Sequence, residues 1–147
     1  MALEEDLGDQ LRDAMRAGDT VRRDTIRQLR AALHNEVIAA GHALDGAAET
    51  TVVRRLVNQH KDSIAEFTKG NRQDLVAKEE AELAILAGLL PEEMNREDIT
   101  KAVTAAISSV GAQGRQDTGK VMRELSGQLK GKADMRTVNE IVQLLLP

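Results

Sequence analysis

The amino-acid sequence predicts an all-α fold arranged as two small helical domains. Its 147 residues include one Phe and neither Tyr nor Trp. Aromatic residues favour strands, whereas the Ala, Leu, Glu, Arg, Lys and Gln that abound here favour helices. Apolar residues also recur every three or four positions along most of the chain, which is typical of helices with one buried face. No segment has the pattern of a strand.

Two helices are predicted before Gly41. The first is expected to end near Gly18, and its apolar stripe consists of Leu3, Leu7, Leu11 and Met15. Asp19 is placed to cap the second helix, which we expect to end near Gly41. The apolar stripe of this second helix consists of Ile26, Leu29, Leu33 and Val37. Residues 41–49 contain two glycines and no periodicity, and they are predicted to form a loop.

The third and fourth helices are predicted to form an antiparallel hairpin, because a very short connection separates them. We expect Gly70 to adopt the left-handed conformation that ends the third helix. Asn71 then caps the fourth helix, with Asp74 in its first turn. The predicted buried face of the third helix consists of Val53, Leu56, Val57, His60, Ile64 and Phe67. That of the fourth consists of Leu75, Val76, Leu83, Leu86 and Leu90.

Pro91 is expected to mark the boundary between the two domains, since a proline disfavours helix at the residue before it. The predicted division is an N-terminal domain (1–90) of about four helices, a linker (91–94) and a C-terminal domain (95–147) of three helices. Asn95 and Asp134 are placed to cap the first and last of these three. Their predicted core positions are Ile99, Val103, Ile107, Val110, Val121, Met122, Leu125, Leu129, Val138, Ile141, Val142 and Leu145.

Composition excludes several classes of protein. Cysteine is absent, so disulfides, thiolate catalysis and Cys-ligated metal sites are excluded. No apolar run approaches the ~20 residues that span a bilayer, and we expect no membrane association. Glu4, Glu5 and Asp6 make the start of the sequence acidic, unlike a signal or transit peptide. A cytoplasmic protein is therefore expected.

Charge is divided unevenly along the chain. Residues 1–94 carry 12 basic and 18 acidic side chains, whereas residues 95–147 carry eight basic and six acidic ones. Within residues 111–136, six basic side chains accompany five of the eleven glycines. Cations beside exposed backbone favour phosphate contacts. The predicted nucleic-acid-binding residues are Arg115, Lys120, Arg123, Lys130 and Lys132. The alternative is that Gly111, Gly119 and Gly131 are helix stops and packing sites.

Other chemistry is poorly supported by the residues. Residues 114–121 resemble a phosphate-binding P-loop, but Val121 stands where a hydroxyl must reach magnesium and no strand precedes the turn. We therefore expect a turn and a helix capped by Asp117. His60 is interpreted as a histidine at the core edge with a hydrogen-bond partner. The adjacent Glu79 and Glu80 are interpreted as solvated charges. No catalytic residue, metal site or cofactor is predicted.

A second basic run lies in the second predicted helix. It consists of Arg22, Arg23, Arg27 and Arg30. Such a run is typical of a solvated helix face, with a phosphate-binding stripe as the alternative.

Particular motifs of this sequence are similar to those of the GatB/YqeY family. They are EFTKGNRQDL (66–75), KEEAELAIL (78–86) followed by LLP (89–91), GKVM (119–122), and KGKAD (130–134) followed by VNEIV (138–142). Leu89 replaces a tyrosine of the family pattern. The chain most resembles the free-standing, bacterial-type members. The resemblance implies two helical domains, the second similar to the tail domain of GatB, which helps to hold tRNA in a tRNA-dependent amidotransferase.

The family resemblance also implies an association with carbon–nitrogen ligase activity that uses glutamine as amido-N-donor. This chain is too short for the catalytic cradle or the amidase of such an enzyme, and its residues do not support independent ligase activity. The first hypothesis is a non-catalytic tRNA-binding or tRNA-enzyme accessory protein. The alternative is an adaptor that docks on an amidotransferase or aminoacyl-tRNA synthetase subunit without touching RNA. An autonomous amidotransferase or hydrolase is the third.

Overall fold

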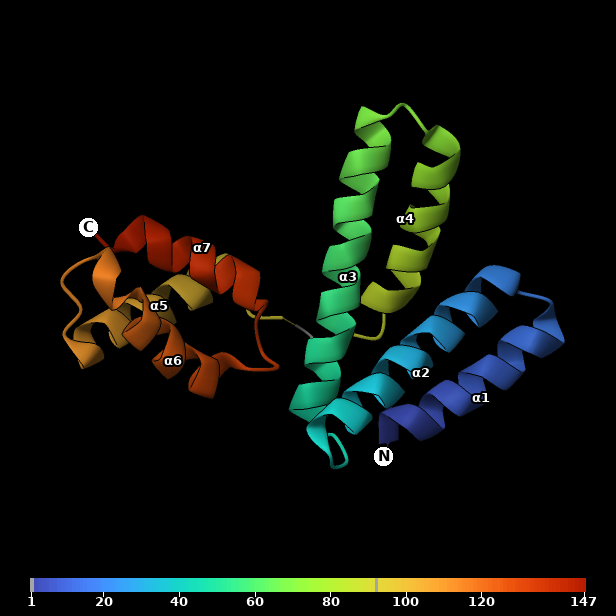
Figure 1. Cartoon of the computed structure of the whole chain (residues 1–147), viewed down its shortest axis with the longest axis horizontal. Helices are drawn as coiled ribbons and strands as arrows, with labels where there is room; N and C mark the ends of the chain where they lie inside the picture. The colour runs from blue at the N-terminus through green and yellow to red at the C-terminus, as the bar shows by residue number, and fades with distance from the viewer. Residues whose placement is uncertain (1, 92) are drawn as a thin grey trace. The chain divides into compact units, whose positions relative to one another are not determined.

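The computed structural model describes residues 2–91 and 93–147, and these residues form helices and no β-strand (Figure 1). The predicted all-α class is confirmed. The elements are α1 (Ala2–Ala17), α2 (Thr20–Ala40), α3 (Gly46–Lys69), α4 (Gln73–Ala87), α5 (Arg96–Val110), the 3₁₀ turn η1 (Arg115–Asp117), α6 (Thr118–Leu129) and α7 (Met135–Leu145). Within the described part of the chain, no helix is long and apolar enough to cross a membrane.

The chain divides into two compact units, Met1–Leu90 and Pro91–Pro147. The predicted division into domains with a linker at 91–94 stays a prediction, and residue 92 of that linker lies outside the described residues. Met94 belongs to the C-terminal unit: its amide donates to the Lys132 carbonyl at 3.1 Å, and its side chain packs on that unit's core.

The N-terminal unit consists of two helical hairpins, α1 with α2 and α3 with α4, and α2 also packs on α3 and α4 (Figure 1). Asp19 and Asp45 cap α2 and α3 by accepting from the backbone amides of Arg22 and Ala48. The predicted loop is shorter than expected, because α3 already begins at Gly46. The core of the unit consists of Leu7, Ile26, Leu29, Leu33, Leu44, Val52, Val53, Leu56, Val57 and Leu86.

The prediction that Met15 lies in the core is wrong. Met15 is 55% exposed, and the neighbouring Ala14 is buried instead. Ala14 lies two helical turns after the fully buried Leu7, so both residues are on the same side of α1. Met15 is one residue later and is therefore rotated by about 100° away from that side of the helix.

The turn between α3 and α4 differs from the prediction by one residue. Gly70 has an ordinary negative φ of −79°, and Asn71 adopts the left-handed conformation with φ 55°. The amides of Asn71 and Arg72 donate to the carbonyls of Thr68 and Phe67, which is the Schellman ending of a helix. Asn71 is therefore the left-handed residue rather than the cap of α4. Asn tolerates this conformation better than any other non-glycine residue, which explains why the turn could move.

This turn gives a matched pair of substitutions. Asn71→Ala should lower the free energy of unfolding by about 1 kcal/mol, since a Cβ without a compensating polar group disfavours positive φ. Gly70→Ala should be neutral or slightly stabilising, because a Cβ there meets the Glu66 and Phe67 carbonyls at ordinary distances of 3.5 and 3.8 Å. Urea unfolding of both variants measures the order. The reverse order would place the left-handed residue at Gly70.

The C-terminal unit packs α5, α6 and α7 around one core. Asn95 and Asp134 cap α5 and α7 as predicted, accepting from the amides of Asp98 and Arg136. The buried residues are Ile99, Val103, Ala106, Val121, Leu125, Leu129, Ala133, Val138, Ile141, Val142 and Leu146.

Four apolar positions of this unit differ from the prediction. Ile107, Val110 and Met122 are partly buried, and Ala106 is the buried residue between Val103 and Ile107 on α5. Leu145 is 42% exposed, whereas Leu146 is buried. The helix ends at Leu145, and Leu146 has an extended backbone that turns its side chain onto the core.

Candidate functional site

Three of the five predicted nucleic-acid-binding residues lie on the exposed side of α6 or directly after its last residue, Leu129. One side of α6 packs into the core of the C-terminal unit through Val121, Leu125 and Leu129. Lys120, Arg123 and Lys130 are exposed. At 3.6 residues per turn, these three side chains project within about 80° of one another and away from the buried stripe. They are named here the basic face of α6.

Two glycines lie on the same exposed side of the helix. A Cβ placed on Gly119 or Gly127 would meet nothing within 4 Å, so packing requires glycine at neither position. A glycine inside a helix costs roughly 1 kcal/mol relative to alanine. Gly111 and Gly131, by contrast, have positive φ angles of 66° and 80° and end helices or turns. The interpretation as helix stops therefore fits these two but not Gly119, whose bare backbone leaves room for a ligand to approach.

The remaining two predicted residues lie farther from α6, one before its start and one after Lys130. Arg115 is the first residue of η1, and Lys132 is in the turn that leads to α7. Both side chains are exposed. A helix of 12 residues is about 18 Å long. The five residues therefore do not surround one point, and the arrangement suits an extended polyanion rather than a single phosphate.

Few carboxylates neutralise these cations. Lys120 Nζ lies 3.8 Å from a carboxylate oxygen of Asp117. Across residues 2–91 and 93–147, no carboxylate lies within ion-pairing distance of Arg115, Arg123, Lys130 or Lys132. The basic face is consequently available to an anionic partner.

Asp117 occupies the predicted capping position of α6, but its side chain does not cap the helix. Its carboxylate accepts from the Gln113 amide at 3.0 Å and so closes the preceding turn, and it makes no capping bond to α6. Val121 is fully buried and faces the core. A side chain in that place cannot face a nucleotide-bound magnesium ion, which agrees with the rejection of a P-loop.

A second polar cluster lies in the α3–α4 hairpin of the N-terminal unit. His60 on α3 is 5% exposed, and the Glu79 carboxylate on α4 accepts a hydrogen bond from its Nδ1. A carboxylate oxygen of Glu82 lies 3.7 Å from the same nitrogen. His60 thus has the hydrogen-bond partner that was expected. The interpretation of Glu79 as a solvated charge is wrong, because the hairpin brings it against His60; Glu80 is exposed.

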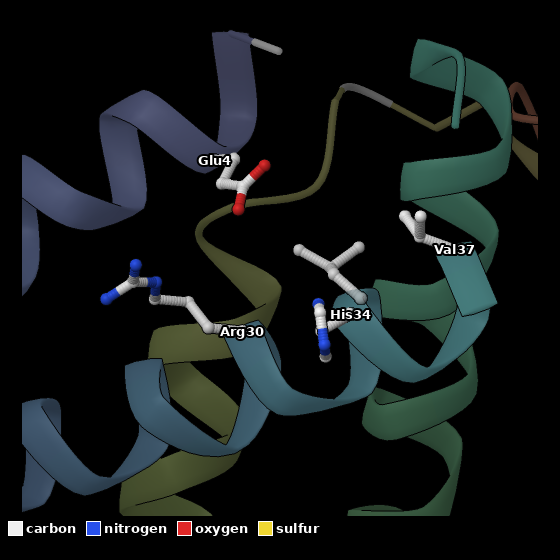
Figure 2. A pocket seen from close by; sticks show the side chains of 5 residues that line it. Glu4, Arg30, His34 and Val37 are labelled. Carbon is white, nitrogen blue, oxygen red and sulfur yellow. The ribbon is translucent and has the colours of Figure 1, made fainter. Parts of the chain in front are cut away.

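A small pocket lies beside α1 and α2 (Figure 2). Glu4 enters it from α1, whereas Arg30, His34 and Val37 come from α2, with Leu33 completing the lining.

The basic run of α2 is only partly available to a ligand. Its first two members form ion pairs along the helix, Arg22 with Asp19 and Arg23 with Asp24.

This chain is similar to proteins that are named as mitochondrial. Three of them share the name "Altered inheritance of mitochondria protein 41, mitochondrial". The relative from Lachancea thermotolerans is 44% identical over 81 residues, which cover 54% of this chain and 43% of the relative. That from Kluyveromyces lactis is 35% identical over 130 residues, 82% of this chain and 70% of the relative. The relative from Pyrenophora tritici-repentis is 29% identical over 136 residues, which cover 90% of this chain and 75% of the relative.

These names contradict the expectation of a cytoplasmic protein, since each relative is named as mitochondrial. The relatives are also eukaryotic, where bacterial-type members were expected. This chain spans less than half of the first relative's length. A family model described as "Yqey-like protein" matches residues 4–146. Because that match extends over nearly the whole sequence, the protein belongs to the family of YqeY-like proteins.

Proposed function

We propose that this protein is a non-catalytic tRNA-binding or tRNA-enzyme accessory protein whose RNA contact is the basic face of α6. The observation that carries the proposal is the alignment of Lys120, Arg123 and Lys130 on the side of α6 opposite the core. The resemblance to the tail domain of GatB supports the choice of tRNA. The family label of carbon–nitrogen ligase then reflects the enzymes that such a tail serves, rather than chemistry by this chain.

The surface chemistry favours phosphate contacts over base recognition. With one Phe and no other aromatic residue, the chain has almost nothing on which to stack an unpaired base. Its net charge of −4 disfavours general attraction to nucleic acid, so the binding must come from a local basic surface. A folded RNA can be recognised through its shape and backbone by such a surface.

The test compares tRNA binding by the wild-type chain and by a basic-face variant with Lys120, Arg123 and Lys130 all replaced by Ala. Each lost phosphate contact removes about 0.7–0.9 from the slope of log affinity against log salt. The basic-face variant should therefore bind at least tenfold more weakly at low salt, and its salt slope should be smaller by about 2. Fluorescence anisotropy across a salt series measures both quantities.

A control variant separates this site from general electrostatics. Arg12, Arg16 and Lys69 are exposed in the N-terminal unit, and replacing all three by Ala changes the net charge by the same amount. This control should keep the wild-type salt slope. Equal losses in both variants would contradict the site. If wild type binds no tRNA, the adaptor alternative gains support, and a pull-down that survives nuclease treatment would identify its partner subunit.

A further inference from the structure

We infer that His60, Glu79 and Glu82 form a binding site for one divalent transition-metal ion, with Zn²⁺ as the reference ion. This site lies in the N-terminal unit and is independent of the proposed RNA contact. It depends on the α3–α4 hairpin, whose helices lie side by side (Figure 1). The hairpin faces a histidine of α3 toward two glutamates of α4 that are three residues apart and so share one helix face.

The distances within the cluster are close to those of a metal site. One ligand atom from each of the three residues lies within 4.8 Å of the other two. Zinc binds imidazole nitrogen and carboxylate oxygen at about 2.0–2.2 Å, which places two tetrahedral ligands about 3.4 Å apart. Rotations of the two glutamate side chains about their flexible bonds would bring all three atoms to this spacing around one ion.

The donor set indicates which ions fit. One imidazole nitrogen with two carboxylate oxygens suits Zn²⁺, Mn²⁺ or Fe²⁺, whereas Mg²⁺ and Ca²⁺ prefer oxygen ligands alone. Three protein ligands leave a fourth position of a tetrahedral ion for water. The site would thus hold an ion that remains open to exchange, unlike a closed structural zinc site with four protein ligands.

Charge balance also favours a divalent ion. The side chains of Glu79 and Glu82 are 19% and 15% exposed, so both carboxylates are largely removed from water. Within the described chain, His60 is the one cationic partner within ion-pairing distance of either carboxylate. A protonated imidazole neutralises one negative charge and leaves the other uncompensated. A divalent ion beside a neutral imidazole balances both.

An entry path for the ion lies next to the cluster. An open cavity with polar walls touches His60 and Glu79 and is further lined by Gln28, Gln59 and Ser63. These amide and hydroxyl groups can hold the waters of an arriving hydrated ion. The cluster is therefore both partly buried and reachable.

The test titrates Zn²⁺ into the full-length, chelator-treated protein by isothermal calorimetry, with thermal unfolding as a second readout. We expect one ion per chain and a rise in Tm with added Zn²⁺, since a ligand that binds the folded state stabilises it. Glu82→Gln should weaken Zn²⁺ binding at least tenfold and abolish the rise in Tm. Glu82 is preferred to His60 for this test because the buried histidine contributes to packing.

Glu80→Gln is the matched control, because Glu80 belongs to the same helix, carries the same charge and is exposed to solvent. This variant should bind Zn²⁺ within twofold of wild type. Two results would overturn the inference: no saturable binding by wild type, or equal binding by the Glu82→Gln and Glu80→Gln variants. The second result would place the ion on surface groups such as His34 or His42, both of which are exposed.

Discussion

Leu125→Ala should lower the free energy of unfolding of the C-terminal unit by about 3 kcal/mol. Leu125 is fully buried in the core that α5, α6 and α7 share. Removing a buried leucine side chain costs 2–5 kcal/mol, roughly, because apolar contacts are lost and a cavity remains. A unit of this size has a small core, so this loss is a large part of its stability.

Urea unfolding followed by circular dichroism measures the effect, with Leu144→Ala as the control. Leu144 lies on α7 and is 72% exposed, so its truncation should change the free energy of unfolding by less than about 0.5 kcal/mol. Because α6 carries Leu125 inward and the basic face outward, the Leu125→Ala variant should also lose tRNA affinity at urea concentrations that spare wild type. Equal stabilities of the two leucine variants would contradict the described core.

Glu49→Gln should increase the free energy of unfolding by about 1–2 kcal/mol at pH 7. Glu49 is 7% exposed in the first turn of α3, and its Oε2 atom is buried without a hydrogen-bond partner. Burial is the largest influence on this carboxyl group, and it raises the pKa above its ordinary value. An unsatisfied buried polar group costs about 1–3 kcal/mol, and an ionised one costs more than a neutral amide.

The sign of the pH dependence follows from the raised pKa. Below the unfolded-state pKa, Glu49 is protonated in both states and costs nothing as a charge. As the pH rises from the unfolded-state pKa through the higher folded-state pKa, the group ionises more readily in the unfolded chain, and wild type loses stability. The Glu49→Gln variant lacks this loss, so the two proteins should converge in acid and separate toward neutrality.

Unfolding free energies at several pH values check this prediction, with Glu66→Gln as the control. Glu66 is an exposed carboxylate of the same helix, and its replacement should change little at any pH. If wild type gained stability over the Glu49→Gln variant between acid and neutral pH, the Glu49 carboxylate would have a stabilising partner after all.

Structural features that depend only on neighbouring residues could be predicted from the sequence. The caps Asp19, Asn95 and Asp134 are where the pattern predicts them, and the second helix ends at Gly41 as expected. Each depends on a side chain and a backbone amide two or three residues away, or on the conformational freedom of one glycine. The exposed face of α6 was also predictable from the sequence. Its buried residues recur every four positions, so the opposite side of the helix faces the solvent.

Features that depend on packing between helices were harder to predict. The periodicity of α1 allows either Ala14 or Met15 to face the core, and the packing of α1 against its neighbours decides between them. The pairing of His60 with Glu79 and Glu82 depends on how α4 lies along α3. Helical spacing within each segment says nothing about that alignment, although the i, i+3 spacing of the two glutamates was a signal that could have been tested.

The left-handed position in the turn between α3 and α4 was only partly predictable from the sequence. Both Gly70 and Asn71 can end a helix, and glycine is the more common choice. The hydrogen bonds of the finished turn place the left-handed residue at Asn71, which one residue type alone could not determine.

The most direct test of the proposed function is the salt dependence of tRNA binding by the full-length wild-type protein, measured beside an equal-length RNA duplex. Three phosphate contacts from the basic face of α6 predict a slope of log affinity against log salt of about −2 to −3, with tighter binding to the folded tRNA. Absence of binding at low salt, where electrostatic contacts are strongest, would contradict the proposal that this surface contacts RNA.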